Sequence, residues 1–240
     1  MAHMRSLPDN YYDLGDCDVQ YGIGEDSKAN KSRGGFVKQK NGTKVYVPAT
    51  DFGDEPWDNA PPSQEYFDEL FRVCRYVILW GANYYQFSQK TSATGLIIWN
   101  KGRRKDAGQS DAEVAWTNLF NGVRIVDYLW DGFQQGRSIK QPMTPRGDKS
   151  KNEKRLQNGH KPIILREIII KRFYKKDWAV YDSHQGSGSL RIACEKHGID
   201  FTGTDISRTR WLRAKDWFDS YPFQQSPILP GRQQTIFNHK

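Results

Sequence analysis

Two glycines at the end of an apolar run have the types and spacing to hold a ligand. The apolar residues 178–181 lead into Asp182-Ser-His-Gln-Gly-Ser-Gly-Ser189, and residues 190–194 then follow helical spacing. A strand that ends in Gly-x-Gly and turns directly into a helix brings bare backbone close to a ligand at a helix N-terminus. We therefore expect a nucleotide-like ligand at Gly186 and Gly188.

An acidic residue farther along completes this pattern. The strand-like residues 199–204 are followed by Asp205, about seventeen residues after Gly188, close to the spacing at which an acid accepts hydrogen bonds from a ribose. The chain lacks the Lys-Ser/Thr pair of a phosphate-binding P-loop and the third glycine of the dinucleotide fingerprint. A nucleoside cofactor without phosphates fits, with S-adenosylmethionine as the obvious candidate. An ordinary strand-to-helix turn is the alternative.

A second candidate site lies near the N-terminus, where a carboxylate and an aromatic residue follow a β-prone run. The strand is expected to end near Asp18, and Tyr21 and Gly22 come shortly after it. At a strand end, an acid can accept hydrogen bonds from an exocyclic amine while a ring stacks on a base. A simple β-turn with a half-buried Tyr21 explains the same residues.

Length and composition restrict the class of protein. The chain has 240 residues, enough for one sizeable α/β domain, and its net charge of +8 with pI near 9.3 favours a polyanionic partner such as nucleic acid. Its three cysteines are far apart, so we expect a reducing compartment and neither a disulfide framework nor a metal site. No apolar run approaches the length of a membrane span, and we expect a soluble, cytoplasmic protein.

The basic residues gather in three segments. The polar residues 25–62, with a hairpin-like Asn41-Gly42, are interpreted as a mobile basic loop that contacts substrate, or else as a solvated insert. Residues 101–105 and 137–161 are also basic. Charge in loops is often only a solvated face, but three such segments in one domain favour phosphate contacts. The candidate DNA contacts are Lys28, Lys31, Arg33, Lys101, Arg103, Arg104, Lys105, Arg146 and Lys149.

The elements that must position these residues follow an α/β pattern. Residues 76–80 and 95–99 are nearly continuous apolar runs, as in strands of a mostly parallel sheet covered on both faces. The remaining spacing predicts strands at residues 112–116 and 123–130 and helices at residues 63–74, 162–173 and 207–218. Cys194-x-x-His197 is interpreted as helix packing and a helix end.

Together these motifs resemble a known family. D-V-Q-Y-G-I-G (18–24), H-K-P (160–162), D-S-H-Q-G-S-G-S (182–189) and G-T-D (203–205) occur in the order found in phage and prophage adenine-specific DNA methyltransferases. L-P-D-N-Y-Y-D-L, Y-F-D-E-L-F-R-V and A-W-T-N-L-F-N extend the resemblance over nearly the whole chain. It implies one domain over residues 5–240 with a Rossmann-like class I methyltransferase fold, and a target-recognition region at about residues 101–160. It also implies methyl transfer from S-adenosylmethionine to the exocyclic amine of adenine in double-stranded DNA.

The resemblance further implies roles for single residues. Asp18 and the carbonyl of Val19 would accept hydrogen bonds from the adenine amine, and Tyr21 would stack on the flipped base. Gln20 completes this catalytic motif. Asp205 would hold the ribose hydroxyls. The rest of the cofactor would be surrounded by Lys161, Pro162, Asp182, His184, Gln185, Gly186, Gly188 and Ser189.

The chain departs from the family pattern at the catalytic motif. Val19 and Gln20 stand where the family has two prolines, so two φ-fixing rings are missing from the turn that aims Asp18. His184 takes a place that is often Phe, and we expect the upstream strand and acid of the adenosine pocket to be absent. Two hypotheses follow: a slow adenine DNA methyltransferase, or a methyltransferase-like protein that binds DNA or a partner with little or no catalysis.

Overall fold

The computed structural model describes residues 1–24, 35–38, 41–47, 58–86, 92–102, 110–131, 134–136, 152–157, 159–223 and 232–237. The helices of this part are α1 (Ala2–Arg5), α3 (Gln64–Val73), α4 (Ile163–Phe173), α5 (Ser189–His197) and α6 (Arg208–Asp219). The strands are β1 (Tyr12–Asp18), β2 (Gly35–Lys38), β3 (Lys44–Val47), β4 (Cys74–Trp80), β5 (Gly95–Asn100), β6 (Ala112–Thr117), β7 (Val123–Asp127), β8 (Leu129–Asp131), β9 (Gln134–Gly136), β10 (Ala179–Asp182), β11 (Asp200–Asp205) and β12 (Gln233–Phe237).

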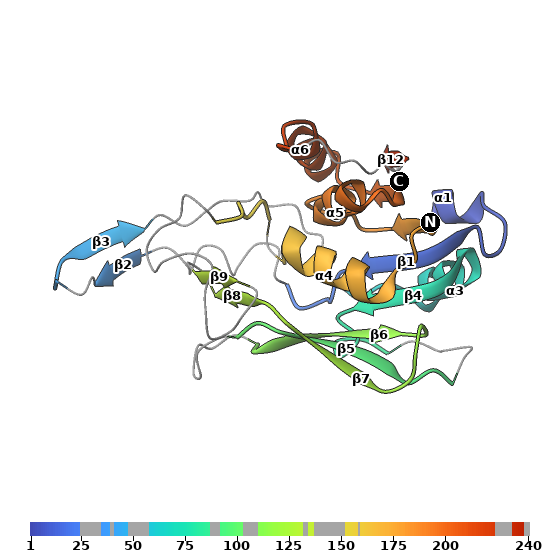
Figure 1. The fold of residues 1–240 in the computed structure, drawn as a ribbon, viewed down its shortest axis with the longest axis horizontal. Helices are drawn as coiled ribbons and strands as arrows, with labels where there is room; N and C mark the ends of the chain where they lie inside the picture. The colour runs from blue at the N-terminus through green and yellow to red at the C-terminus, as the bar shows by residue number, and fades with distance from the viewer. Residues whose placement is uncertain are drawn as a thin grey trace.

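One sheet runs through the molecule (Figure 1). Among the described residues, its eight strands follow the order β12-β11-β10-β1-β4-β6-β5-β7. Neighbouring strands are parallel except at β6, which is antiparallel to both β4 and β5. The sheet is therefore mostly parallel, as the sequence predicts.

Helices cover both faces of this sheet. Successive side chains of a strand point to opposite faces, so β1 and β4 supply residues to two hydrophobic cores. One core joins Leu14 and Ile78 to the apolar sides of α4 and α5, and the other joins Cys17 and Val77 to α3. The expected Rossmann-like α/β fold, with helices on both faces, is confirmed.

Two predicted elements differ most from those in the structure. The expected helix through Cys74 ends at Val73, and Cys74 opens β4 without a loop, in extended backbone at φ −114° and ψ 126°. The expected strand over residues 123–130 is instead two strands, β7 and β8, that separate at Tyr128. Tyr128 is fully buried, and its amide donates to the carbonyl of Asn100 at 3.1 Å. The apolar pattern continues through the bend because the bend itself is buried.

Three elements, α1, β9 and β12, are additional to the predicted ones. Met4 of α1 is fully buried in the same core as α3, and the Arg72 guanidinium donates to the carbonyls of Met4 and Leu7, each at 2.8 Å. β12 pairs in parallel with β11 at the edge of the sheet. α1 and β9 have four and three residues, too few for a periodic pattern, and β12 (Gln-Gln-Thr-Ile-Phe) has no apolar alternation.

The expected hairpin at Asn41-Gly42 is present. β2 and β3 pair antiparallel around it, and the Asn41 side chain accepts from the Thr43 amide at 3.1 Å. Residues 25–34, 39–40 and 48–57 of the expected basic loop lie outside the described residues. In the part of the chain that the structure describes, no helix has the length and apolar character needed to cross a membrane.

A buried carboxylate joins β1 and β4 to α4. Asp16 is fully buried and accepts hydrogen bonds from Trp80 Nε1 at 2.9 Å, Arg166 Nη1 at 2.7 Å and Tyr174 Oη at 2.5 Å. Removing a charge from water costs several kcal/mol unless the partners satisfy it well. The three donors meet that condition, and they fix α4 against the sheet.

We predict that Tyr174→Phe lowers the free energy of unfolding by about 1–3 kcal/mol, because it leaves a buried acceptor with one donor fewer. Urea denaturation measures the change. Tyr11→Phe is the matched control, since Tyr11 is 53% exposed, and it should alter stability little. Equal effects of the two substitutions would contradict a structural role for this cluster.

Candidate active site

The carboxyl ends of adjacent parallel strands bring three aspartates to one edge of the sheet. β1 ends at Asp18, β10 at Asp182 and β11 at Asp205, and these three strands are neighbours. Open α/β sheets bind ligands at this edge. Residues 185–188, the glycine turn, are distant in the sequence from the Asp-Val-Gln-Tyr motif at residues 18–21. The order of the strands therefore brings the two side by side.

The Asp205 side chain at the end of β11 accepts hydrogen bonds from main-chain amides, one of which belongs to the glycine turn. The Gly186 amide donates to Asp205 Oδ2 at 3.1 Å, and the Ser207 amide donates to Asp205 Oδ1 at 2.8 Å. Gly186 and Gly188 have φ of 51° and 80°, which glycine adopts without strain. A Cβ on Gly186 would lie 2.4 Å from Gln157 Nε2. A side chain at this position would therefore collide with the Gln157 amide.

Asp182 is the last residue of β10, directly before the glycine turn, and its side chain binds the backbone that leads into the turn. The side chain is 1% exposed and accepts from the His184 amide at 3.0 Å. Burial raises the pKa of Asp182 to about 8, against the opposing effect of the Arg166 guanidinium. This carboxyl group is therefore protonated over much of the neutral range.

His184 is held as a neutral ring. Its Nδ1 lies 2.8 Å from Ser183 Oγ, and Ser183 Oγ lies 2.6 Å from Tyr66 Oη. The Tyr66 ring meets the imidazole edge-on, with centroids 5.4 Å apart. Burial lowers the pKa of His184 to about 3. The uncharged imidazole can thus replace the apolar aromatic ring that is often found at this position in the family that the sequence resembles.

Asp18 and Tyr21 meet in the turn that follows β1. Tyr21 Oη donates to Asp18 Oδ1 at 2.7 Å, and Lys161 Nζ lies 2.5 Å from the same oxygen and 3.1 Å from Tyr21 Oη. The Tyr21 ring stacks on Tyr84 with centroids 4.9 Å apart and planes 13° apart. A Cβ on Gly81 would lie 2.0 Å from the Tyr21 ring. Burial raises the pKa of Tyr21 well above its usual value, so the phenol keeps its proton.

The side chains of Val19 and Gln20 differ in burial at this turn. Val19 is 2% exposed and belongs to the core on the α3 side of the sheet, whereas Gln20 is partly exposed. Both residues line a cavity. Apolar packing of Val19 therefore restrains the turn at one of the two positions where the related motif has proline.

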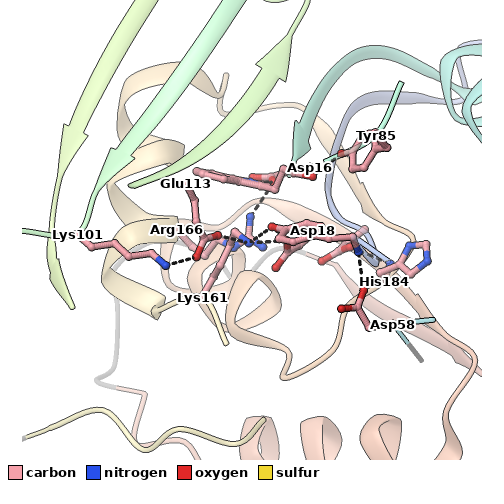
Figure 2. Close-up of polar contacts among 12 residues, drawn as sticks. Asp16, Asp18, Asp58, Tyr85, Lys101, Glu113, Lys161, Arg166 and His184 are labelled. Carbon is pink, nitrogen blue, oxygen red and sulfur yellow. Dashed lines mark hydrogen bonds and ion pairs between the residues drawn. The ribbon is translucent and has the colours of Figure 1, made fainter. Parts of the chain in front are cut away.

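A chain of charges extends from Asp18 across the site (Figure 2). Lys161 Nζ also lies 3.0 Å from Glu113 Oε2, and Lys101 Nζ lies 2.6 Å from Glu113 Oε1. Burial raises the pKa of Glu113, but the two ammonium groups outweigh burial and hold this pKa well below its usual range. The sequence assigns no role to Glu113, and it assigns Lys101 to DNA and Lys161 to the cofactor. These three side chains meet because β6 and the residue after β5 lie close to the segment before α4, and the sequence gives no signal for this approach.

One cavity of about 370 Å³ joins the two predicted sites. Asp182, Gly188 and Pro162 are not among its lining residues, and Pro162 is the N-cap of α4 rather than its first helical residue. The predicted site residues that line the cavity are Asp18, Val19, Gln20, Tyr21, Lys101, Lys161, His184, Gln185, Gly186, Ser189 and Asp205. The turn after β1 and the glycine turn thus line one cavity.

Most of the candidate DNA contacts fall where the structure gives no placement. Lys101 is described, and its ammonium is paired with Glu113 at the cavity wall. Lys28, Lys31, Arg33, Arg103, Arg104, Lys105, Arg146 and Lys149 lie outside the described residues.

Comparison with known proteins gave structural similarities only. No protein-family model matches the chain, and no curated protein does. The chain is similar to the solved complex of M1.HpyAVI with SAM, at 13% identity and a TM-score of 0.44 over 89% of this chain and 91% of that one. It is also similar to TTHA0409 of Thermus thermophilus, a candidate DNA modification methylase, at 14% identity and a TM-score of 0.47 over 98% and 96% of the two chains.

The raised pKa of Asp182 predicts how stability depends on pH. The folded chain binds this proton more tightly than the unfolded chain does. It therefore loses stability as the pH rises from 3.8, the ordinary pKa of aspartate, to about 8, the pKa of Asp182 in the folded chain. Asp182→Asn keeps a neutral side chain of the same shape. We expect the stability of the variant relative to the wild type to increase from about pH 5 to about pH 9 in urea denaturation. Asp219→Asn, on the exposed side of α6, is the control. A difference between Asp182→Asn and wild type that does not vary with pH would show that Asp182 is ionised throughout.

Proposed function

We propose that this chain is a DNA methyltransferase that transfers the methyl group of S-adenosylmethionine to the exocyclic amine of adenine. The observation that carries the proposal is the shared cavity, which has the glycine turn with Asp205 on one side and Asp18 with Tyr21 on the other. Group transfer requires donor and acceptor to be held within contact distance of each other. A nucleoside-binding turn and an amine-binding turn on one cavity meet that requirement.

The glycine-turn side of the cavity fits the cofactor. Gly186 lines the cavity with bare backbone, and an added Cβ would lie 2.4 Å from Gln157 Nε2. The buried Gln185 Oε1 has no hydrogen-bond partner among the described residues, and a ligand's ammonium or hydroxyl group would satisfy it. Each carboxylate oxygen has two lone pairs, so Asp205 can accept ribose hydroxyls as well as its two backbone amides. The exposed Ile206 beside it offers apolar surface to a nucleobase. When bound, the cofactor supplies a methyl group on sulfonium, which is already activated.

The Asp18 side of the cavity fits the adenine amine. Tyr21 and Lys161 both contact Asp18 Oδ1, and no described residue donates to Oδ2. The proposal assigns the amine protons to this Oδ2 and to the carbonyl of Val19, which leaves the nitrogen lone pair for the methyl group. The base would stack on the aromatic pair formed by Tyr21 and Tyr84.

The target strand would be held mainly through its phosphates. The net charge of +8 and the three basic segments suit the duplex backbone. We assign these contacts to Lys28, Lys31, Arg33, Arg103, Arg104, Lys105, Arg146 and Lys149. Lys101 is assigned to Glu113 instead, because its ammonium is already paired there.

Two observations favour a second function, a methyltransferase-like DNA-binding protein with little catalysis. Lys161 Nζ lies 2.5 Å from Asp18 and offsets the negative charge that the amine would meet, and the turn also lacks two proline rings. The two functions differ in turnover, whereas both include cofactor and DNA binding.

We predict that Gly186→Ala weakens binding of S-adenosylmethionine by about tenfold or more, which is about 1.4 kcal/mol, because its Cβ would meet Gln157 and its φ is 51°. Titration calorimetry measures the affinity. Gly122→Ala is the matched control, since Gly122 has φ of 84° but nothing closer than 3.9 Å to an added Cβ. Undetectable binding to the wild type at millimolar cofactor, or equal affinity in both variants, would contradict the cofactor site.

We predict that Asp18→Ala and Tyr21→Ala lower the rate of methyl transfer to DNA by about a hundredfold or more, because each removes a group that holds the amine or the base. Tyr21→Phe keeps the ring and loses only the hydroxyl that donates to Asp18, so we expect a smaller loss of about tenfold. Transfer of labelled methyl to unmethylated DNA measures the rates. Tyr11→Ala, just before the opposite end of β1, should leave them unchanged. Wild-type rates in Asp18→Ala would contradict the assignment.

A further inference from the structure

Asp58 is a nearly buried carboxylate beside the catalytic turn, with 1% of its surface exposed. Its Oδ1 accepts the amides of Tyr21 and Gly22, each at 2.7 Å, and its Oδ2 accepts the amide of Ile23 at 3.3 Å. Figure 2 shows this side chain below Asp18. Three successive backbone amides therefore converge on one side chain.

The backbone around Asp58 also fits closely against the turn. The Gly24 amide donates to the carbonyl of Asp58 at 3.1 Å. A Cβ on Gly22 would lie 2.6 Å from Pro61 Cδ, and Gly22 has φ of 73°. Residues 21–24 are thus joined to residues 58–61 through both side-chain and main-chain contacts.

Successive amides that point at one anion fix the peptide planes between them. The sequence gives the turn no such restraint of its own, because Val19 and Gln20 leave φ free where proline would fix it. Asp58 restrains the next residues from outside the turn. Tyr21, whose backbone it holds, carries the hydroxyl that donates to Asp18 and the ring that stacks on Tyr84.

We propose that Asp58 is a positioning residue that fixes the backbone of residues 21–23 and so aims Tyr21 at Asp18 and at the base. It serves in place of the ring restraint that the catalytic motif lacks. The inference rests on the proposed function for its effect on turnover, whereas the restraint on the backbone is measurable without turnover.

The test compares Asp58→Ala and Asp58→Asn with the wild type. Asp58→Ala removes all three acceptor contacts. Asp58→Asn keeps a carbonyl oxygen for the two shorter ones. Gly22→Ala disturbs the packing of residues 21–24 against residues 58–61, because its Cβ would collide with Pro61. Asp219→Ala, on the exposed side of α6, is the matched control.

Two readouts separate positioning from loss of structure. Amide hydrogen exchange, followed by mass spectrometry on peptides covering residues 19–24, should speed up about tenfold or more in Asp58→Ala and in Gly22→Ala. In methyl transfer, kcat of Asp58→Ala should fall about a hundredfold, while affinity for S-adenosylmethionine stays within about twofold. Asp58→Asn should recover most of this kcat, and Asp219→Ala should match the wild type.

Unchanged exchange over residues 19–24 in Asp58→Ala overturns the inference. The inference is also overturned if Asp58→Ala loses as much cofactor affinity as kcat and exchanges faster throughout the chain. Asp58 would then support the fold in general. If the wild type transfers no methyl group to DNA but Asp58→Ala still speeds exchange at residues 19–24 alone, the restraint stands and the proposed function fails.

Discussion

The ammonium group of Lys161 lies between two carboxylates, and the arrangement of the site depends on this contact. Lys161 contacts Asp18 at the end of β1 and Glu113 in β6, while Lys101 also pairs with Glu113. Two positive and two negative groups thus offset one another in a site largely removed from water. Removal of one partner from such a buried set typically costs about 3–5 kcal/mol, because a charge is left without compensation. The network therefore holds the catalytic turn, the sheet and the segment before α4 in one arrangement.

The same network sets the electrostatic conditions of the proposed reaction. With Oδ1 of Asp18 held by Lys161 and Tyr21, the carboxylate has a fixed orientation and one oxygen directed away from these donors. Fixed orientation favours transfer, whereas partial neutralisation of Asp18 weakens its hold on an amine that gains positive charge. Glu113 lessens that neutralisation because it shares the Lys161 ammonium. Neutral His184 and protonated Asp182 add no further charge beside the glycine turn.

The sequence predicts the parts of the site that depend on local chemistry. Gly186 and Gly188 are required by a left-handed turn, and Asp205 and Asp18 are strand-end residues, so pattern and spacing identify them. Asp58, Glu113 and Asp16 give no such signal, because each acts through partners from remote segments. The strand pattern likewise predicts a mostly parallel sheet but not the break at Tyr128, where the buried Val126, Tyr128 and Leu129 continue the apolar pattern through the bend.

The central claim is that one cavity brings a methyl donor to the exocyclic amine of adenine. The most direct test incubates unmethylated DNA of varied sequence with the protein and S-adenosylmethionine carrying an isotopically labelled methyl group. The DNA is then digested to nucleosides, which are analysed by mass spectrometry. The account predicts the label on the exocyclic nitrogen of deoxyadenosine. Label on deoxycytidine, or no labelled nucleoside although cofactor and DNA both bind, would contradict it.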